Sequence, residues 1–229
     1  MHYNAPRDSE IELILVKEDH LPSQNVKAED WRQKGLVPRL KFNEVITFRT
    51  GIYTYRQMLS IYFNRSDLRP AKLSFSSQEW CGQTFKEFLF GPKKAHLSFN
   101  SYWENEAKGE RDLDWIEGAY PYNALPVVLR AMRPNEKKSV QLHLLTDVIS
   151  NKVGTPKLID ANANFLGLKD GNLVVEVQID GKKDQYQFST DAMFPLLHIE
   201  RGDGSHYQVE KRLVDDYWHH NRPGDEKLL

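Results

Sequence analysis

The segment Ser76-Ser77-Gln78-Glu79-Trp80-Cys81-Gly82 holds the one cysteine of the sequence beside a carboxylate and an indole. A cysteine becomes a nucleophile when a nearby base takes its proton, and His96 and His143 are the candidate bases. In this hypothesis the chain is a hydrolase centred on Glu79 and Cys81. The alternative is that Cys81 is a small buried apolar residue, because no local residue indicates an activated thiolate.

Three carboxylates in the same half of the chain suggest a second chemistry. Glu79, Glu87 and Glu104 include candidate acid–base pairs of the kind that glycosidases place about a scissile bond. Spacing in sequence does not fix their separation in space, so geometry has to decide. Glu79 is equally suited to a structural hydrogen bond that fixes the end of a strand.

The last part of the chain, 217–226, contains two adjacent histidines and two carboxylates. His219, His220 and Asp225 are of types that bind zinc. However, the sequence has no His-x-x-x-His or Cys-x-x-Cys spacing, and adjacent histidines on a strand point to opposite faces. We therefore predict that no metal binds here.

Glycine-rich signals for a cofactor are incomplete. Gly202-x-Gly204 lacks the third glycine of a dinucleotide loop, and Ser76 and Ser77 do not lie in a Gly-x-Ser-x-Gly elbow. We predict no cofactor.

Aromatic residues are frequent in the strand-like segments, and they suggest a binding surface. A wide curved sheet leaves room for an apolar molecule or a glycan on its concave side, although core packing is the more frequent role of such residues. The candidate ligand-binding residues are Tyr53, Tyr55, Tyr62, Trp80 and Trp103.

Composition excludes several classes of protein. The 229 residues include 31 Lys and Arg against 32 Asp and Glu, a net charge of −1, so the cationic surplus of a nucleic-acid binder is missing. No run of about 18 apolar residues is present, which predicts no transmembrane helix. A single cysteine rules out an intrachain disulfide.

The elements that must position these residues are mainly strands. Apolar and polar residues alternate from Leu173 to Ile179, Asp180-Gly181 follows as a turn signal, and a return strand covers 185–189. Similar alternation in the N-terminal half predicts a mainly β fold, a large curved antiparallel sheet that tends to a barrel. Sandwich, barrel and open curved sheet remain open alternatives.

One segment reads as a helix, Tyr122 to Met132, with Asn123 as its N-cap and Pro134 as its stop. The charged stretch Glu104 to Asp114 is expected to be an exposed connection. Without a linker or a repeat, we predict a single domain over residues 1–229, in which 1–10 and 219–229 are extended tails.

Three motifs carry a resemblance to a known family. They are Phe48-Arg49-Thr50-Gly51-Ile52-Tyr53, the segment 76–82 and the segment 217–225. Together they resemble an uncharacterised bacterial family of envelope-associated, lipoprotein-like proteins, some of which carry a septum-formation-inhibitor label that we consider mistaken. The resemblance runs from about Ile11 to the end of the chain.

The resemblance implies export, an acylated cysteine near the start of the precursor, a largely β fold and a periplasmic or outer-membrane location. The first ten residues are polar and show no export signal, so the chain as written is expected to be cytoplasmic. Our first functional hypothesis is a non-enzymatic envelope module that binds a lipid, a glycan or a protein partner on a curved β surface. The hydrolase centred on Glu79 and Cys81 is the alternative.

Overall fold

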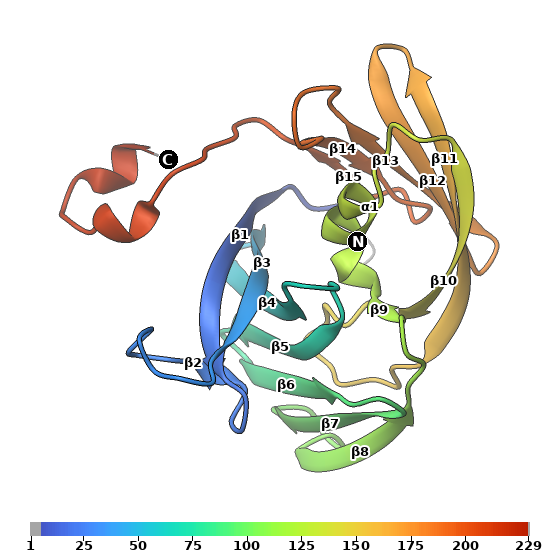
Figure 1. The fold of residues 1–229 in the computed structure, drawn as a ribbon. Coiled ribbons are helices and arrows are strands. Elements are labelled where there is room, and N and C mark those ends of the chain that lie inside the picture. Colours follow the sequence, from blue (N-terminus) through green and yellow to red (C-terminus); the bar gives the residue numbers. More distant parts are fainter. Residues whose placement is uncertain (1–5, 229) are drawn as a thin grey trace.

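The computed structural model describes residues 6–228, whose strands form two curled sheets that face each other as half-barrels (Figure 1). The first sheet has eight strands, all antiparallel to their neighbours, in the order β2-β1-β3-β4-β5-β6-β7-β8. Its strands are β1 (Ser9–Leu21), β2 (Val26–Lys27), β3 (Val37–Thr50), β4 (Tyr53–Asn64), β5 (Pro70–Glu79), β6 (Gly82–Phe90), β7 (Lys94–Ser101) and β8 (Lys108–Asp114).

The second sheet has seven strands in the order β15-β14-β13-β12-β11-β10-β9, and only the short β9 runs parallel to its neighbour β10. A 3₁₀ turn, η1 (Tyr122–Ala124), and the helix α1 (Leu125–Ala131) lie between β9 and β10 in the chain. The strands are β9 (Tyr120–Pro121), β10 (Lys138–Leu145), β11 (Leu158–Lys169), β12 (Asn172–Ile179), β13 (Lys182–Phe188), β14 (Leu196–Glu200) and β15 (His206–Gln208).

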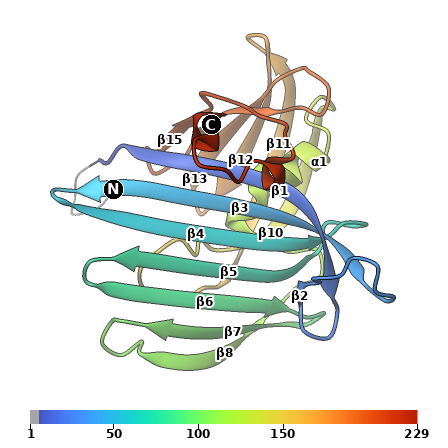
Figure 2. The same cartoon turned by 90° about the vertical axis from the view of Figure 1, so that its left-hand side faces the viewer.

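The first sheet is largely a meander, in which each of β4 to β8 lies beside the strand that precedes it in the chain (Figure 2). Its hairpins keep the apolar set on one face, because the register pairs residues of like orientation. Phe42 lies opposite Ile61, and Leu73 lies opposite Phe88. All four side chains are buried and belong to one core.

Two apolar clusters fill the space between the sheets, and α1 contributes to both. Val127 and Val128 pack into the cluster of the first sheet. Leu125 and Leu129 pack into the cluster of the second sheet, which contains Val175. The helix therefore joins the two half-barrels through opposite sides of its surface.

The mainly β, curved and antiparallel fold predicted from the sequence is confirmed, but the strands divide between two sheets and not one. The predicted helix is also present, although its first residues form η1 and its α-helical part begins only at Leu125. Asn123 is not its N-cap, because Ala124 holds that position and makes no side-chain cap. The stretch 104–114, expected to be a connection, contains β8, which pairs with β7.

Beyond Val209 the chain leaves the second sheet and extends away from both half-barrels (Figure 1). This C-terminal arm, residues 210–228, contains two 3₁₀ turns, η2 (Tyr217–His219) and η3 (Asp225–Leu228). Neither these turns nor any other helix within residues 6–228 is long and apolar enough to cross a membrane.

Candidate functional site

Cys81 and Glu79 lie at the tip of the β5–β6 hairpin. Cys81 is exposed in the turn, so it is not the buried apolar residue of the structural interpretation. Glu79 ends β5 and accepts a hydrogen bond of 2.8 Å from Asn151 Nδ2. This bond ties the hairpin to the loop of residues 146–157, which joins β10 to β11.

The two candidate bases lie elsewhere. His96 is on the outer face of the first sheet, and its Nδ1 is 2.9 Å from an Asp112 carboxylate oxygen. His143 is on the outer face of the second sheet, and its Nδ1 is 2.8 Å from an Asp160 oxygen. The structure therefore does not bring the histidines to Cys81, and no thiol–imidazole pair forms among these residues.

Glu79 and Glu87, two of the three candidate carboxylates, are also separated. Glu87 points to the outer face of the first sheet, where its carboxylate is 2.7 Å from Lys72 Nζ, whereas Glu79 points to the inner face. Glu104 lies in the connection between β7 and β8. Because two of the three point to opposite sides of one sheet, that pair cannot flank a scissile bond.

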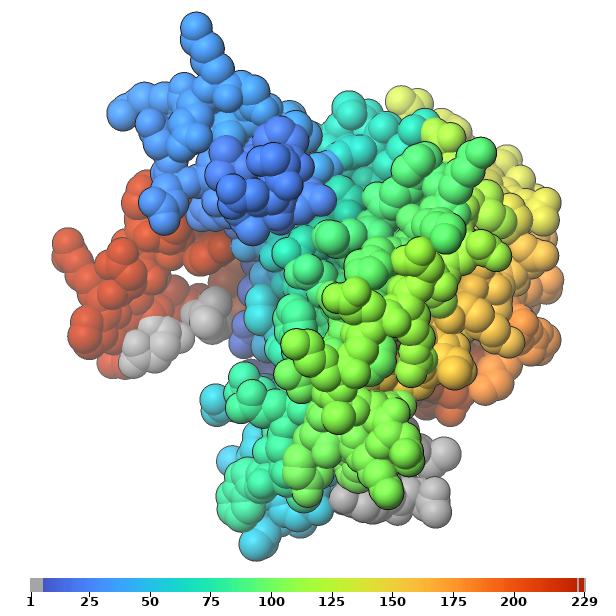
Figure 3. All heavy atoms as spheres, turned by 90° about the horizontal axis from the view of Figure 1, so that it is seen from below, coloured from blue at the N-terminus to red at the C-terminus, as the bar shows by residue number. Residues whose placement is uncertain are grey.

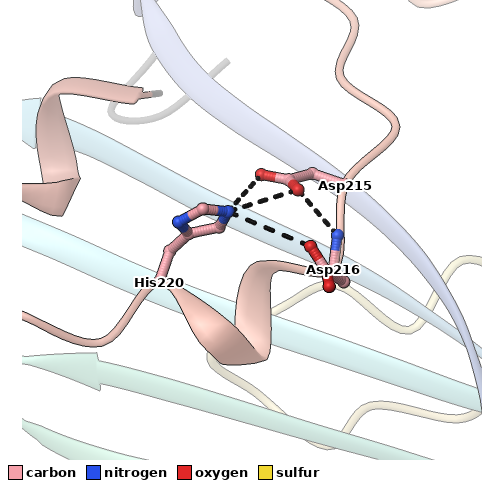
Figure 4. Close-up of side chains that lie close together, drawn as sticks. All are labelled: Asp215, Asp216 and His220. Atoms are coloured by element: carbon pink, nitrogen blue, oxygen red, sulfur yellow. Dashed lines mark hydrogen bonds and ion pairs between the residues drawn. The ribbon is translucent and has the colours of Figure 1, made fainter.

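The C-terminal arm holds the histidine-rich segment, and Asp215, Asp216, His219 and His220 are exposed there. His220, Asp215 and Asp216 offer ligand atoms within 4.8 Å of one another (Figure 4). His219 instead pairs with Asp216 at 2.6 Å, and Asp225 accepts a hydrogen bond from the Arg222 amide. Ion pairs of this kind are common among exposed groups.

The candidate aromatic residues occupy three places. Tyr53 lies next to Tyr55 and Trp80, with ring centroids 5.8 and 5.9 Å away, at one end of the first sheet. Tyr62 is on the outer face of the same sheet, with its ring centroid 5.2 Å from that of His20. Trp103 lines a surface groove.

This groove has a volume of about 520 Å³ and lies between the β7–β8 connection and the loop 146–157. Such a volume is within the usual range of small-molecule sites. We call it the Trp103 groove. Its lining residues are Trp103, Glu104, Asn105, Glu106, Arg111, Lys152, Gly154 and Thr155.

Several contacts hold the two walls of the Trp103 groove together. Glu106 accepts hydrogen bonds from the amides of Val153 and Gly154 at 2.8 and 3.0 Å. Partial burial tends to raise the pKa of Glu106, but these two hydrogen bonds hold that pKa below its usual value. Arg111 donates to the Gly154 carbonyl at 2.8 Å, and the Lys152 ammonium lies 5.0 Å from the Trp103 ring centroid.

Lys86 anchors the loop 146–157 to β6. It points inward from β6, and its Nζ donates to the carbonyls of Val148, Ser150 and Lys152 at 2.7, 2.9 and 2.8 Å. Burial lowers the pKa of Lys86 to about 8. An ammonium group has three donors, so the three carbonyls use its full capacity and fix the curvature of the loop.

A second group of polar residues lies between the two sheets, and most of its members are buried or partly buried. The Arg201 guanidinium lies between two tyrosine rings, 5.0 Å from the Tyr122 centroid and 4.8 Å from the Tyr207 centroid. Its Nη1 donates to Asp147 at 3.4 Å. The Tyr122 hydroxyl in turn donates to Asp184, which also accepts the Gly202 amide at 2.8 Å. We call these residues, with Glu44 and Asn123, the inter-sheet polar cluster.

Glu44 brings the first sheet into this cluster. It points inward from β3 and is 4% exposed. Burial raises the pKa of Glu44 to about 7, although the nearby Arg201 and Asn123 oppose this rise. Asn123 Oδ1 and Arg201 Nε have no hydrogen-bond partner among the described residues, so the cluster is not fully satisfied.

The sequence did mark the inter-sheet polar cluster and Lys86, but only indirectly. Glu44 stands between Phe42 and Ile46, and Lys86 stands two residues before Phe88, so both occupy inward positions of their strands. A charged residue at an inward position of a strand has to find a partner inside the protein. A charged residue that interrupts the apolar positions of a strand is therefore the signal by which the sequence indicates these buried polar sites.

Comparisons with protein family models, with curated proteins and with solved structures return no match to the chain. The geometry of the site therefore has to carry the functional argument.

Proposed function

We propose that this protein is a binding module for saccharides, and that the ligand occupies the Trp103 groove. The observation that carries the proposal is the placement of an indole ring in a groove of about 520 Å³ beside the side chains of Glu104, Asn105 and Thr155. Trp103 is one of the residues for which the sequence predicts a ligand-binding role.

The chemistry of the lining favours a saccharide over a lipid. An aromatic ring offers an apolar face to the C–H groups of a sugar ring, and carboxylate, amide and hydroxyl groups bind its hydroxyls. The groove contains one large aromatic side chain among several charged and polar ones, whereas an acyl chain requires a continuous apolar lining. Its walls are held by Lys86 and Glu106, so they need little ordering when a ligand binds.

The proposed module is not catalytic. Cys81 has neither candidate base beside it, and Glu79 is engaged by Asn151. We further propose that it works in the bacterial cell envelope, and the support for this is the resemblance of the three motifs. Fractionation of the native host with an antibody to the protein tests the location.

The binding test is titration of the full chain with a panel of neutral and acidic tetrasaccharides, followed by tryptophan fluorescence and calorimetry. Trp103→Ala should weaken binding by at least about tenfold, since one stacked ring contributes on the order of 1 kcal/mol or more beyond its buried area. Lys152→Ala should preserve or strengthen binding, because it uncovers the ring while the backbone carbonyl that meets Lys86 stays in place.

Two matched tryptophan variants locate the ligand. Trp31→Ala removes an indole that is 70% exposed in the loop before β3, and it should leave binding unchanged. Trp80→Ala removes the indole beside Tyr53. If Trp80→Ala abolishes binding and Trp103→Ala does not, the groove is the wrong site; if no saccharide of the panel binds, the proposed function is wrong.

A further inference from the structure

β1 presents a long open edge. It pairs with β3 from Ser9 to His20, and on its other side it pairs with β2 only at His20 and Leu21. Within residues 6–228, the backbone from Ser9 to Asp19 therefore has no ladder partner on that side. The register with β3 runs through this stretch without a shift, so the open edge is regular as well as long. Regular open edges promote pairing with another chain.

The outer strands at the other sheet edges are short or highly charged. β15 and β9, at the two edges of the second sheet, have three and two residues. β8, at the far edge of the first sheet, has seven residues, of which only Gly109 and Leu113 are uncharged. Short strands and charged side chains are the usual protection of an edge. β1 is 13 residues long and therefore lacks the first of these protections.

Residues 9–16 of β1, which we call the edge segment, are mainly aliphatic and incompletely covered. Leu13 and Leu15 point to the inner face of the sheet and are 37% and 40% exposed. Phe42, which lies opposite Leu15 in the ladder, is 3% exposed. The packed core thus stops at β3, and a further strand beside β1 would cover both leucines.

The charge of the edge segment is of one sign. Glu10 and Glu12 are exposed, and the segment contains no basic residue. The nearest bases in the chain, Arg7 and Lys17, lie outside it. The β3 residues opposite the two glutamates are uncharged, so the ladder supplies no counter-charge there. A strand with basic side chains on one face and apolar side chains on the other therefore complements this edge.

We propose that the edge segment is a docking site for an extended segment of another protein, in which basic and apolar residues alternate and which adds to β1 as a further strand. Strand addition satisfies the open backbone groups, and the side chains on alternate faces give specificity. The basic side chains meet Glu10 and Glu12, and the apolar ones cover Leu13 and Leu15. In the strand order of the first sheet, β1 is five places from β7, so this site is separate from the Trp103 groove and does not rest on the proposed function.

The C-terminal arm and a second copy of the chain fit this edge less well. The regular elements of the arm are the turns η2 and η3, and the arm stands to the side of the N-terminal strands with open space between them (Figure 3). The extended part of the arm, residues 210–215, carries two acidic and two basic side chains and so has no net charge to offer. A second copy brings an equally acidic edge, which lacks the complementary charge.

Two synthetic peptides that match the edge segment in length test the site. One alternates lysine with valine, and the other alternates glutamate with valine. By fluorescence anisotropy at low salt, the lysine peptide should bind the full chain, and the glutamate peptide should bind at least about tenfold more weakly. Failure of the lysine peptide to bind overturns the proposal.

Hydrogen exchange followed by nuclear magnetic resonance locates the bound peptide. The amides of an edge strand in an antiparallel sheet alternate between the ladder and the open side. The open-side amides of the edge segment should exchange fast in the free chain and slowly with the lysine peptide bound. Protection that appears elsewhere contradicts strand addition. Protection already present in the free chain, from its own arm or from a second copy, overturns the choice of partner.

The variant Glu10→Gln/Glu12→Gln tests the charge, and its melting temperature should stay unchanged because both side chains are exposed. It should bind the lysine peptide about tenfold more weakly at low salt and nearly as well as the original protein at high salt, where the ion pairs are screened. The matched control, Glu110→Gln/Asp114→Asn, neutralises two exposed carboxylates of the other edge strand, β8, and should leave the affinity unchanged. Equal effects of the two variants would show a general attraction of cationic peptides and would exclude the site.

Discussion

At the scale of single residues, the protein buries the charged side chains of Lys86 and Glu44 among apolar ones, and the two differ in how fully their charge is compensated. Lys86 finds three carbonyls and keeps its ammonium fully hydrogen bonded. Glu44 faces Arg201, yet Arg201 is shared with Asp147 and two tyrosine rings. Because the compensation of Glu44 is incomplete, its ionisation should oppose folding.

The pH dependence of stability tests this directly. Burial raises the pKa of Glu44 from its ordinary value of 4.5 to about 7, so ionisation is harder in the folded protein. Glu44 is protonated in both states below pH 4.5 and does not affect stability there. The free energy of unfolding then falls as the pH rises from 4.5 to about 7. A shift of this size corresponds to a loss on the order of 3 kcal/mol. In Glu44→Gln the free energy of unfolding, from urea titrations between pH 4.5 and 8, should be flatter. An unchanged profile in the variant would contradict the assignment.

Sequence reasoning named Cys81, His96 and His143 because their side chains have the right chemistry, but it could not place them. Whether two side chains meet depends on which face each strand presents and on which sheet it joins. The partner of Glu44 illustrates the difficulty, because Arg201 follows β14, more than a hundred and fifty residues later. Alternation marks Glu44 as buried, and nothing in the local sequence indicates its counter-charge.

At the scale of elements, short-range signals predicted most of the structure. The Asp180-Gly181 hairpin forms as expected, between β12 and β13. β8 was missed because Lys108–Asp114 is charged and has little apolar alternation, and it becomes a strand by pairing with β7. The division into two sheets depends on β9 and α1, which connect them, and no local pattern specifies such a long-range arrangement.

The loop 146–157 is the element on which the Trp103 groove depends. Lys86→Met should leave three carbonyls without their shared donor and destabilise the protein by about 2–4 kcal/mol. The loop should then be cleaved faster by proteases, and the exchange of its amides should accelerate. Lys72→Met on the neighbouring strand removes the half-buried pair with Glu87 and should cost less than about 1 kcal/mol, with unchanged loop cleavage. Equal effects of the two changes would show that Lys86 does not anchor the loop.

At the scale of the whole molecule, the two half-barrels share one short helix and one polar cluster. α1 is only seven residues long, so it has little stability of its own and forms because both cores bury it. Glu44 from the first sheet and Arg201, directly after β14 of the second, add an electrostatic attraction between the same halves. This arrangement favours unfolding of both sheets in one step, as expected for the single domain predicted from the sequence.

Hydrogen exchange in increasing denaturant can test whether the sheets unfold together. Peptides from β5–β7 and from β12–β13 should lose protection at the same denaturant concentration. Leu129→Ala removes a buried side chain that packs only in the second cluster, and it should cost about 2–5 kcal/mol. If the sheets are coupled, this cost appears equally in the first sheet, because opening either sheet exposes the other side of α1.

Val128→Ala is the matched change in the first cluster and should lower the protection of β12–β13 in the same way, by a smaller amount. Loss of protection confined to the sheet that carries the change would instead show two independently unfolding halves.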